Sequence, residues 1–266
     1  MRKTALYIMV FIELVSLFLG CNKEPSPLNN STPPQISYDA SGTDSKIGIC
    51  GTKLFTITDD KLIVLDISSP GNPTFIGTVK LNIYPQSLYC KGDTMFIGHL
   101  YGIDIYNVSN PLSPVFISSL DADKTNWPII ANDKFAFISF HKFYLPGIYQ
   151  YGYGSTYYSD DKLKLFDISN IVKPKLDSTL GMIFPSGLAI DNSKLYVCDT
   201  GLVIYDLTTL PTLKLKKHFV LNYSPSKILV TNNKILLSGI DGIYQYLYDQ
   251  DTTISQLSKI KVFPIK

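Results

Sequence analysis

The chain has 266 residues, of which 45% are hydrophobic and 12% aromatic, so it can bury a core of one large or two ordinary domains. Its formal net charge is only +2, which gives no sign of a nucleic-acid-binding surface, and we expect no nucleic acid among its partners. Tyrosine, phenylalanine, glycine and proline are all abundant, and aromatic residues between frequent turn formers favour β-strands over helices.

The N-terminus has the pattern of a signal peptide. Arg2 and Lys3 give it a basic start, and the apolar stretch that follows is shorter than a membrane-spanning helix needs. The stretch ends in Leu-Phe-Leu-Gly-Cys at Cys21, which resembles a bacterial lipobox. It departs from the usual pattern at Phe18, where Leu is usual, and at Glu13, which is an unusual charge in the apolar stretch. The resemblance implies that residues 1–20 are removed and that Cys21 is lipidated. An ordinary signal peptide or a short anchor helix is the alternative.

The segment after Cys21 is polar. Residues 22–44 are rich in Pro, Ser, Asn and Thr, which is typical of a flexible tether. Its first residues, Asn-Lys-Glu, resemble the tag that sends some lipoproteins of Gram-negative bacteria to the outer face of the outer membrane. We therefore expect a signal peptide over 1–20, a lipidated cysteine and tether over 21–44, and a folded domain over 45–266. The expected location is the bacterial cell envelope, on the outer membrane and at the cell surface.

A short motif occurs five times along the folded part of the chain. It is clearest in Asp59–Pro70, which reads Asp-Asp-Lys-Leu-Ile-Val-Leu-Asp-Ile-Ser-Ser-Pro. Its strand ends at Asp66, Asn107, Asp167, Asp206 and Leu247, and the strand before it starts at Lys53, Thr94, Lys134, Lys194 and Lys234. Both series give a unit of about 40 residues, and both place one insertion of about 20 residues between Lys134 and Leu163.

Each unit contains four strand signals, which we name A, B, C and D. The second unit shows them at 87–90, 94–98, 102–108 and 114–117, with turn residues between them. Units of this length with four short strands are the signature of a β-propeller. The sequence therefore predicts an all-β, five-bladed propeller of four-stranded antiparallel blades, with no strand exchanged between the termini. The predicted blades are 45–81, 86–120, 126–179, 185–219 and 225–264.

Strand C and its turn resemble the LVIVD-repeat family. The family pattern is hydrophobic-x-hydrophobic-x-Asp, then a β-branched residue, Ser, Asn and Pro, and it is carried by 62–70, 103–111 and 163–170, with Ile171 in place of the last proline. The resemblance spans 45–264 and implies an exported bacterial propeller of undefined activity. We expect the Asp that ends strand C to accept hydrogen bonds from turn amides. These aspartates stand one per unit and cannot converge on a calcium ion.

The sequence offers no recognisable catalytic site. The predicted inner strands hold no Asp, Glu or His, so they lack the carboxylate pair of a glycosidase. No nucleophile elbow or phosphate-binding loop occurs. We interpret the three histidines, His99, His141 and His218, as surface or loop residues, and we expect no enzyme activity, no cofactor and no metal. The alternative is a hydrolase with loop carboxylates at Asp121, Asp123, Asp160 and Asp161.

Three cysteines remain after Cys21. Cys50, Cys90 and Cys198 match no metal-site spacing, and an odd number makes a poor disulfide framework. We expect them to be small buried hydrophobic residues. A Cys50–Cys90 bond is the alternative, because both residues lie on inner strands of adjacent units.

A partner is expected at the face that carries the B–C and D–A loops, because antiparallel strands place these loops at one end of every blade. Four D–A loops bring an aromatic residue close to a proline, at Tyr84, Trp127, Phe184 and Tyr223. The insertion, residues 140–161, lies in the third B–C loop and adds six tyrosines, Tyr144, Tyr149, Tyr151, Tyr153, Tyr157 and Tyr158. Tyrosine with glycine and serine is the composition of paratopes. The alternatives are aromatic wedges between blades and a self-packed hairpin.

Together these features predict a non-catalytic lipoprotein of the cell envelope. It is anchored to the membrane and binds a protein partner through this loop face. A glycan ligand is the alternative, since tyrosine and tryptophan rings stack on sugars. A purely structural component of the envelope is a third reading.

Overall fold

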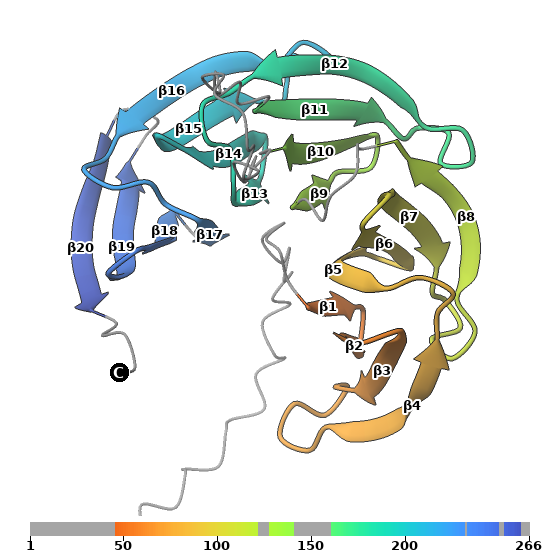
Figure 1. Ribbon diagram of the computed structural model, residues 1–266. Helices are drawn as coiled ribbons and strands as arrows, with labels where there is room; N and C mark the ends of the chain where they lie inside the picture. Colours follow the sequence, from red (N-terminus) through yellow and green to blue (C-terminus); the bar gives the residue numbers. More distant parts are fainter. Residues whose placement is uncertain (1–45, 122–127, 141–160, 232, 250–252, 262–266) are drawn as a thin grey trace, which may run out of the picture. The chain divides into compact units, whose positions relative to one another are not determined.

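Twenty β-strands form five antiparallel sheets in the computed structural model (Figure 1), which describes residues 46–121, 128–140, 161–231, 233–249 and 253–261. Blade 1 consists of β1 (Ile47–Cys50), β2 (Lys53–Thr58), β3 (Lys61–Asp66) and β4 (Thr74–Lys80). Blade 2 consists of β5 (Pro85–Lys91), β6 (Thr94–His99), β7 (Gly102–Asn107) and β8 (Val115–Leu120). Blade 3 consists of β9 (Ile129–Ala131), β10 (Phe135–Phe140), β11 (Lys162–Asp167) and β12 (Lys175–Gly181). Blade 4 consists of β13 (Leu188–Asp191), β14 (Lys194–Asp199), β15 (Gly201–Asp206) and β16 (Lys214–Val220). Blade 5 consists of β17 (Lys227–Thr231), β18 (Lys234–Gly239), β19 (Gly242–Asp249) and β20 (Thr253–Lys261).

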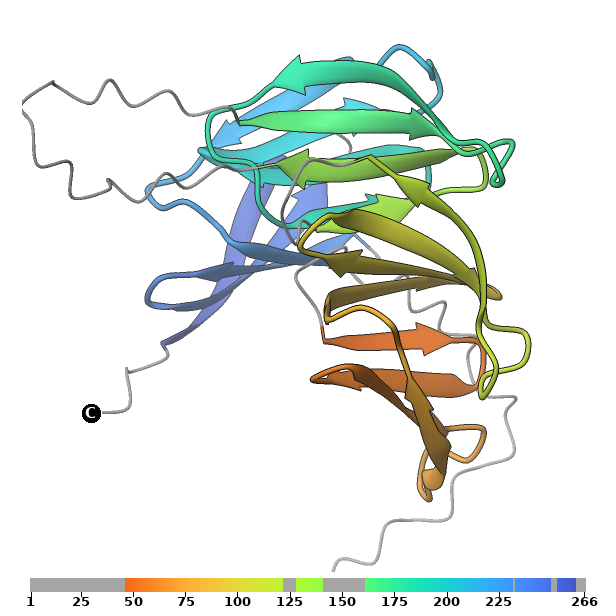
Figure 2. The ribbon, with the colours of Figure 1, turned by 45° about the vertical axis from the view of Figure 1, so that its right-hand side comes forward.

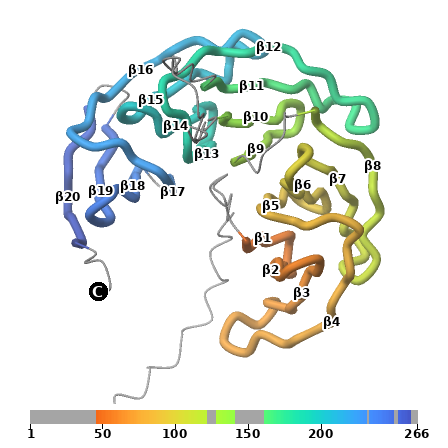
Figure 3. Tube along the Cα trace, in the orientation of Figure 1, coloured from red at the N-terminus to blue at the C-terminus, as the bar shows by residue number. Residues whose placement is uncertain are grey.

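The predicted five-bladed propeller is confirmed. Every sheet is built from four strands that are consecutive in the chain, in the order A, B, C, D, so no described strand is exchanged between blades. The tube in Figure 3 follows the chain into each blade at an inner strand and out at an outer one. The inner strands β1, β5, β9, β13 and β17 lie next to one another in that order.

Period-two alternation lets each blade pack on both sides. In β6, Met95 and Ile97 join the core shared with blade 1, whereas Phe96 between them joins the core shared with blade 3. We call the sheet face that meets the following blade its front face, and the one that meets the preceding blade its back face. Because both faces are buried, the strands read as nearly continuous hydrophobic runs. Burying one such side chain contributes about 1.5–3 kcal/mol.

The blades stack face to face (Figure 2), and polar groups add links between them. The Tyr89 hydroxyl in blade 2 donates to the Ala131 carbonyl in blade 3 at 3.0 Å. The Ser139 hydroxyl in blade 3 donates to the Ser186 carbonyl at the start of blade 4 at 2.6 Å. Each link satisfies a polar group that the interface would otherwise bury without a partner.

A disulfide joins blades 1 and 2. Cys50 and Cys90 are bonded, with Cα atoms 5.2 Å apart, so the prediction that both are unpaired hydrophobic residues is wrong and its alternative holds. The reason is topological, since both residues stand at the end of an inner strand in adjacent blades and come within disulfide range. Cys198 is free and buried, as expected, and burial raises the pKa of its thiol.

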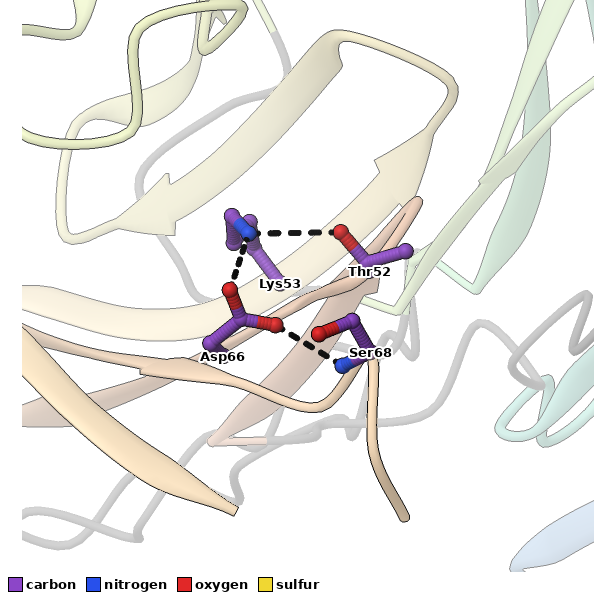
Figure 4. A network of polar contacts seen from close by, with 4 residues as sticks. All are labelled: Thr52, Lys53, Asp66 and Ser68. Atoms are coloured by element: carbon purple, nitrogen blue, oxygen red, sulfur yellow. Dashed lines mark hydrogen bonds and ion pairs between the residues drawn. The ribbon is translucent and has the colours of Figure 1, made fainter. Parts of the chain in front are cut away.

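The residue that ends strand C accepts the expected hydrogen bond from an amide of the C–D turn. The Ser68 amide donates to Asp66 Oδ1 at 2.8 Å, and Lys53 Nζ donates to Asp66 Oδ2 at 2.7 Å (Figure 4). The same turn bond runs from Ser169 to Asp167 and from Thr208 to Asp206, at 2.8 Å in both cases. Blade 2 forms it with an amide oxygen, from Ser109 to Asn107 at 3.0 Å. The hydrogen bond from Lys53, and after it the bonds from Ser68, hold the pKa of Asp66 below its usual range.

Blade 3 departs from the predicted register by one residue. Its strand B begins at Phe135 rather than Lys134, because Phe135 lies opposite Asp167 as Lys53 lies opposite Asp66. Lys134 belongs to the preceding turn, where its carbonyl accepts a hydrogen bond from the Ile168 amide. The predicted start of this strand, at Lys134, is therefore one residue too early.

Candidate partner-binding face

The B–C and D–A connections of the blades share one end of the molecule. Within each sheet this follows from the antiparallel order of the strands. Between blades it follows from side-by-side contacts at equal heights, such as the Cys50–Cys90 bond. Gly187 and Lys227, equivalent residues at the starts of blades 4 and 5, are also neighbours. We call this end the B–C/D–A face.

Large apolar side chains are exposed at this face. The exposed large apolar side chains of the described B–C turns are Leu100, Tyr101 and Ile240, with exposed fractions of 52%, 71% and 98%. Those in the D–A loops are Tyr84, Ile183 and Phe184, with exposed fractions of 77%, 65% and 39%. Six large apolar side chains are therefore exposed on the loops of this face, and exposed apolar side chains that share a surface mark candidate interaction sites.

Two of the predicted binding residues lie as a binding role requires. Tyr84 and Phe184 are exposed, whereas the prolines that follow them, Pro85 and Pro185, are buried. In these two loops the proline takes the packing position and leaves the aromatic side chain at the surface.

Tyr223 takes the packing role that was the alternative. Its ring stacks on Tyr244 with centroids 4.0 Å apart, and its hydroxyl lies 3.1 Å from the Tyr246 hydroxyl. The side chain is half-buried against the core of blades 4 and 5, and this burial raises its pKa. Tyr223 therefore stabilises blade 5 and contributes little free surface.

The remaining predicted residues lie outside the described part of the chain. They are Trp127, Tyr144, Tyr149, Tyr151, Tyr153, Tyr157 and Tyr158, together with Asp123, Asp160 and His141. The described residues do show where the insertion starts and returns. Phe140 at the end of β10 lies opposite Lys162 at the start of β11, so residues 141–160 connect neighbouring strand ends on the B–C/D–A face.

A buried carboxylate holds one of the exposed loops. Asp199, the last residue of β14, is only 5% exposed and accepts hydrogen bonds from the amides of Ile183 and Phe184. Charge-assisted bonds of this kind are stronger than neutral ones. No sequence pattern predicted this role for Asp199, because the loop it binds is part of the connection between two blades.

His99 occupies the equivalent position in blade 2. The interpretation of it as a surface histidine is wrong, because its side chain is 11% exposed with Nε2 3.3 Å from Asp104 Oδ1. Its Nδ1 accepts a hydrogen bond from the Tyr101 amide at 3.3 Å, which fixes the turn that carries Leu100 and Tyr101. His218 on the outer strand β16 is exposed, as expected.

In blade 5 an ion pair holds the B–C turn. Asp241 accepts a hydrogen bond from the Tyr244 hydroxyl and forms an ion pair with Lys259, both at 2.5 Å. The Lys259 contact, followed by that of Tyr244, lowers the pKa of Asp241. The adjacent Ile240 is thereby held at the tip of a fixed turn.

The described residues contain no group of three His, Cys, Asp or Glu side chains placed to hold a metal ion. Of the loop carboxylates in the hydrolase alternative, Asp121 is exposed and Asp161 is buried. Within the described ranges no helix is long and apolar enough to cross a membrane.

No family model matches the chain, and no curated protein matches it. Solved structures with similar folds include a protein from Lactobacillus plantarum, with a TM-score of 0.57 and 14% identity over 78% of this chain and 65% of that one. A functionally unknown protein from Desulfotomaculum acetoxidans gives 0.55 and 11% over 79% and 67%. A hypothetical selenium-binding protein from Sulfolobus tokodaii gives 0.55 and 11% over 79% and 59%.

These similarities show the fold alone. The chain spans about three-fifths to two-thirds of the length of the structures it resembles. The protein belongs to the class of β-propeller scaffolds, and the apolar B–C/D–A face is its candidate site.

Proposed function

We propose that the protein is a non-catalytic lipoprotein of the cell envelope whose propeller binds a protein partner through the B–C/D–A face. One observation carries the proposal, which is the set of six exposed apolar side chains on the B–C and D–A loops of that face. A few anchor side chains that lose their water on contact, most often large and aromatic, dominate the free energy of protein association.

The fixed backbone of these loops supports the same function. Asp199 holds the loop with Ile183 and Phe184, and His99 holds the turn with Tyr101. Side chains on a pre-ordered loop lose less entropy on binding than those on a mobile one. Protein scaffolds commonly present their binding residues on loops in this way.

The choice of a protein over a glycan rests on the aliphatic residues. Leu100, Ile183 and Ile240 present branched apolar groups that fit an apolar protein surface and make no stacking contact with a sugar ring. A glycan remains the second candidate because Tyr84 and Tyr101 are the most exposed aromatic side chains of the described face. The tyrosine-rich insertion would enlarge the surface in either case.

Location and family membership complete the proposal. The signal-peptide pattern and Cys21 support a lipid anchor on the outer membrane, and residues 22–44 would serve as the tether. The C–D turns in blades 1 to 4 share the Asp or Asn anchor, which supports membership of the LVIVD-repeat family.

The proposal is tested by affinity capture from an envelope extract with matched variants. A Tyr101→Ser/Ile240→Ser double variant should lose a captured partner by roughly tenfold or more, because both anchors are removed. Val172→Ser is the control, since Val172 is 61% exposed on a C–D turn at the opposite end. Equal capture by all three proteins would contradict the proposal. Capture of glycans alone, on an array, would favour the second candidate.

A further inference from the structure

Basic side chains gather on the outer strands of the blades. The five outer strands, β4, β8, β12, β16 and β20, together carry seven lysines and one acidic residue, Asp177. The chain as a whole is nearly balanced, with 24 basic and 22 acidic residues. Because these strands form the outer rim of the propeller (Figure 1), the rim is more basic than the rest of the molecule.

The most basic of these strands is β16 of blade 4. It reads Lys-Leu-Lys-Lys-His-Phe-Val, and six of its seven side chains are exposed. Its aliphatic residues Leu215 and Val220 have exposed fractions of 55% and 80%. Lysines and exposed apolar side chains therefore share one strand at the surface. We call five of its residues the β16 rim: Lys214, Leu215, Lys216, Lys217 and Val220.

The outer strand of the preceding blade repeats part of this pattern. Lys175 and Leu176 begin β12, and Leu176 is 52% exposed. The two residues lie opposite the last two positions of strand C, as Lys214 and Leu215 do in blade 4. The pairing of a lysine with an exposed leucine therefore extends over the rim of two neighbouring blades.

The fold does not require this much lysine on its rim. A charge on an open outer strand prevents pairing with another chain. However, β8 has no charged residue and completes its blade in the same way. Some rim lysines have a structural partner, since Lys80 pairs with Asp60. Lys259 likewise pairs with Asp241. In contrast, β16 has three lysines and no acidic residue of its own.

We propose that the β16 rim docks the propeller onto an anionic membrane surface. The stem of a lysine can lie along apolar lipid while its ammonium group stays among the headgroups. Leu215 and Val220 supply apolar contact beside the lysines. Each lysine near an anionic leaflet adds an attraction that salt weakens. Asp206 lies opposite Lys214 and balances one of the three charges, so two act on the lipid in full.

A membrane fits this surface better than another macromolecule does. The rim is convex (Figure 1), and a fluid bilayer adapts to a convex wall, whereas a folded protein must offer a complementary concave surface. A nucleic acid would attract the lysines but would gain nothing from Leu215 and Val220. Docking by the rim leaves the B–C/D–A face free, and it depends neither on a lipid anchor nor on a protein partner at that face.

Co-sedimentation with lipid vesicles tests the proposal. The protein is residues 22–266, which lack Cys21 and contain the compact unit 38–266 with every described strand. It should bind phosphatidylcholine vesicles that contain phosphatidylglycerol, and rising salt should release it. It should not bind vesicles of phosphatidylcholine alone. Absence of binding to the anionic vesicles at low salt overturns the proposal.

Two variants separate the charged from the apolar part of the contact. Lys214→Gln/Lys216→Gln/Lys217→Gln should weaken binding to anionic vesicles by roughly tenfold or more, because three attracting charges are removed. Leu215→Ser/Val220→Ser should also weaken it, but the salt dependence should stay, because the lysines remain. Circular dichroism verifies that both variants are folded, which is expected of exposed residues on an outer strand.

The control removes the same charge from another part of the surface. Lys46→Gln/Lys61→Gln/Lys227→Gln replaces three exposed lysines at the B–C/D–A end of the blades. This variant should keep most of the binding to anionic vesicles. Equal losses in the two triple variants would show that only the net charge of the protein matters, and would overturn the proposal.

A second measurement locates the contact without removing a charge. Leu215→Cys is labelled through a maleimide with a dye whose emission shifts to the blue in apolar surroundings. Anionic vesicles should shift this emission, but not that of the same dye at Tyr84→Cys on the B–C/D–A face. Cys198 is buried, and Cys50 and Cys90 are bonded to each other, so none of them competes for the label. A shift at Tyr84 alone would place the membrane contact on the other surface and overturn the proposal.

Discussion

At the scale of single residues, the side chain that ends strand C joins the strand to its turn. In blade 1, Asp66 accepts from the Ser68 amide on one oxygen and from Lys53 on the other. Blade 2 keeps the first bond with Asn107 and has Thr94 in place of the lysine. The comparison between the blades separates the turn-forming role of the oxygen from the ion-pairing role of the charge.

The first prediction concerns this pair of roles. Asp66→Ala should lower the melting temperature at pH 7 more than Asp66→Asn does, because the amide keeps the turn bond and loses only the ion pair. The folded state lowers the pKa of Asp66, so the stability it contributes is present above its ordinary pKa of about 3.9 and is lost as pH falls further. The difference between wild type and Asp66→Asn should therefore shrink below about pH 4. Thermal melts at pH 7 and pH 3 measure it, and a difference that grows with acid would count against this account.

The second prediction concerns the disulfide. The Cys50–Cys90 bond closes a loop with a sequence separation of 40 residues. By chain entropy such a bond stabilises the folded state by about 4 kcal/mol. Urea unfolding of the oxidised and the reduced protein should show this difference in the free energy of unfolding. Cys198 does not affect the comparison, because its thiol is free and buried in both. Equal midpoints after complete reduction, verified by thiol titration, would show that the bond adds no stability.

At the scale of elements, the longest connection between two consecutive strands of a blade is the insertion between β10 and β11. Because Phe140 and Lys162 lie opposite each other, the two strands need only a short turn to connect them. The third prediction follows from this pairing. Replacing residues 141–161 by Asn-Gly should preserve the fold, since this leaves a two-residue turn between Phe140 and Lys162 and such a turn suits adjacent antiparallel strands. The blade core, with Phe137, Leu163 and Leu165 at 0% exposure, is untouched.

The same variant should keep its β circular-dichroism spectrum and lose partner binding, because the tyrosine-rich part of the B–C/D–A face is gone. Failure to fold would assign the insertion to the core. Folding with unchanged affinity for the partner would place the binding surface elsewhere, with the C–D turns as the next region to test.

Much of the element-scale architecture can be predicted from the sequence, for physical reasons. The repeat of turn residues and alternating strands determines the number of blades and the place of the insertion, and both are confirmed. A register shift between strands C and D recurs in every blade, for example between Val64 and Leu65, and no residue pattern indicated it. Bulges depend on how the outer strand twists across its neighbour, which local sequence describes poorly.

The site was harder to predict than the fold. Leu100, Tyr101 and Ile240 lie in ordinary two-residue turns, and only the alignment of blades shows that they share a face with Tyr84. Asp199 and His99 act on backbone amides that are brought near by folding. Contacts of this kind depend on tertiary structure, which single-sequence reasoning does not provide.

At the scale of the whole molecule, the expected lipid anchor determines where the propeller works. The fourth prediction is that Cys21→Ala moves the protein from the membrane fraction to the soluble fraction of the envelope. Two or more acyl chains give stable membrane attachment, whereas a chain without them has only its tether. Fractionation and mass spectrometry of the N-terminal peptide measure the effect. Unchanged membrane association without lipid mass would contradict the expectation.

Site-specific photo-cross-linking can show whether the B–C/D–A face contacts a protein partner. A photo-reactive phenylalanine analogue is placed at Tyr101 or at Ile240, and, as a control, at Val172 on the opposite end. All three side chains are more than half exposed, so the analogue should not disturb the fold. We predict a shared cross-linked protein band from Tyr101 and Ile240 and none from Val172. A band that forms from Val172 and from neither loop position would contradict the account.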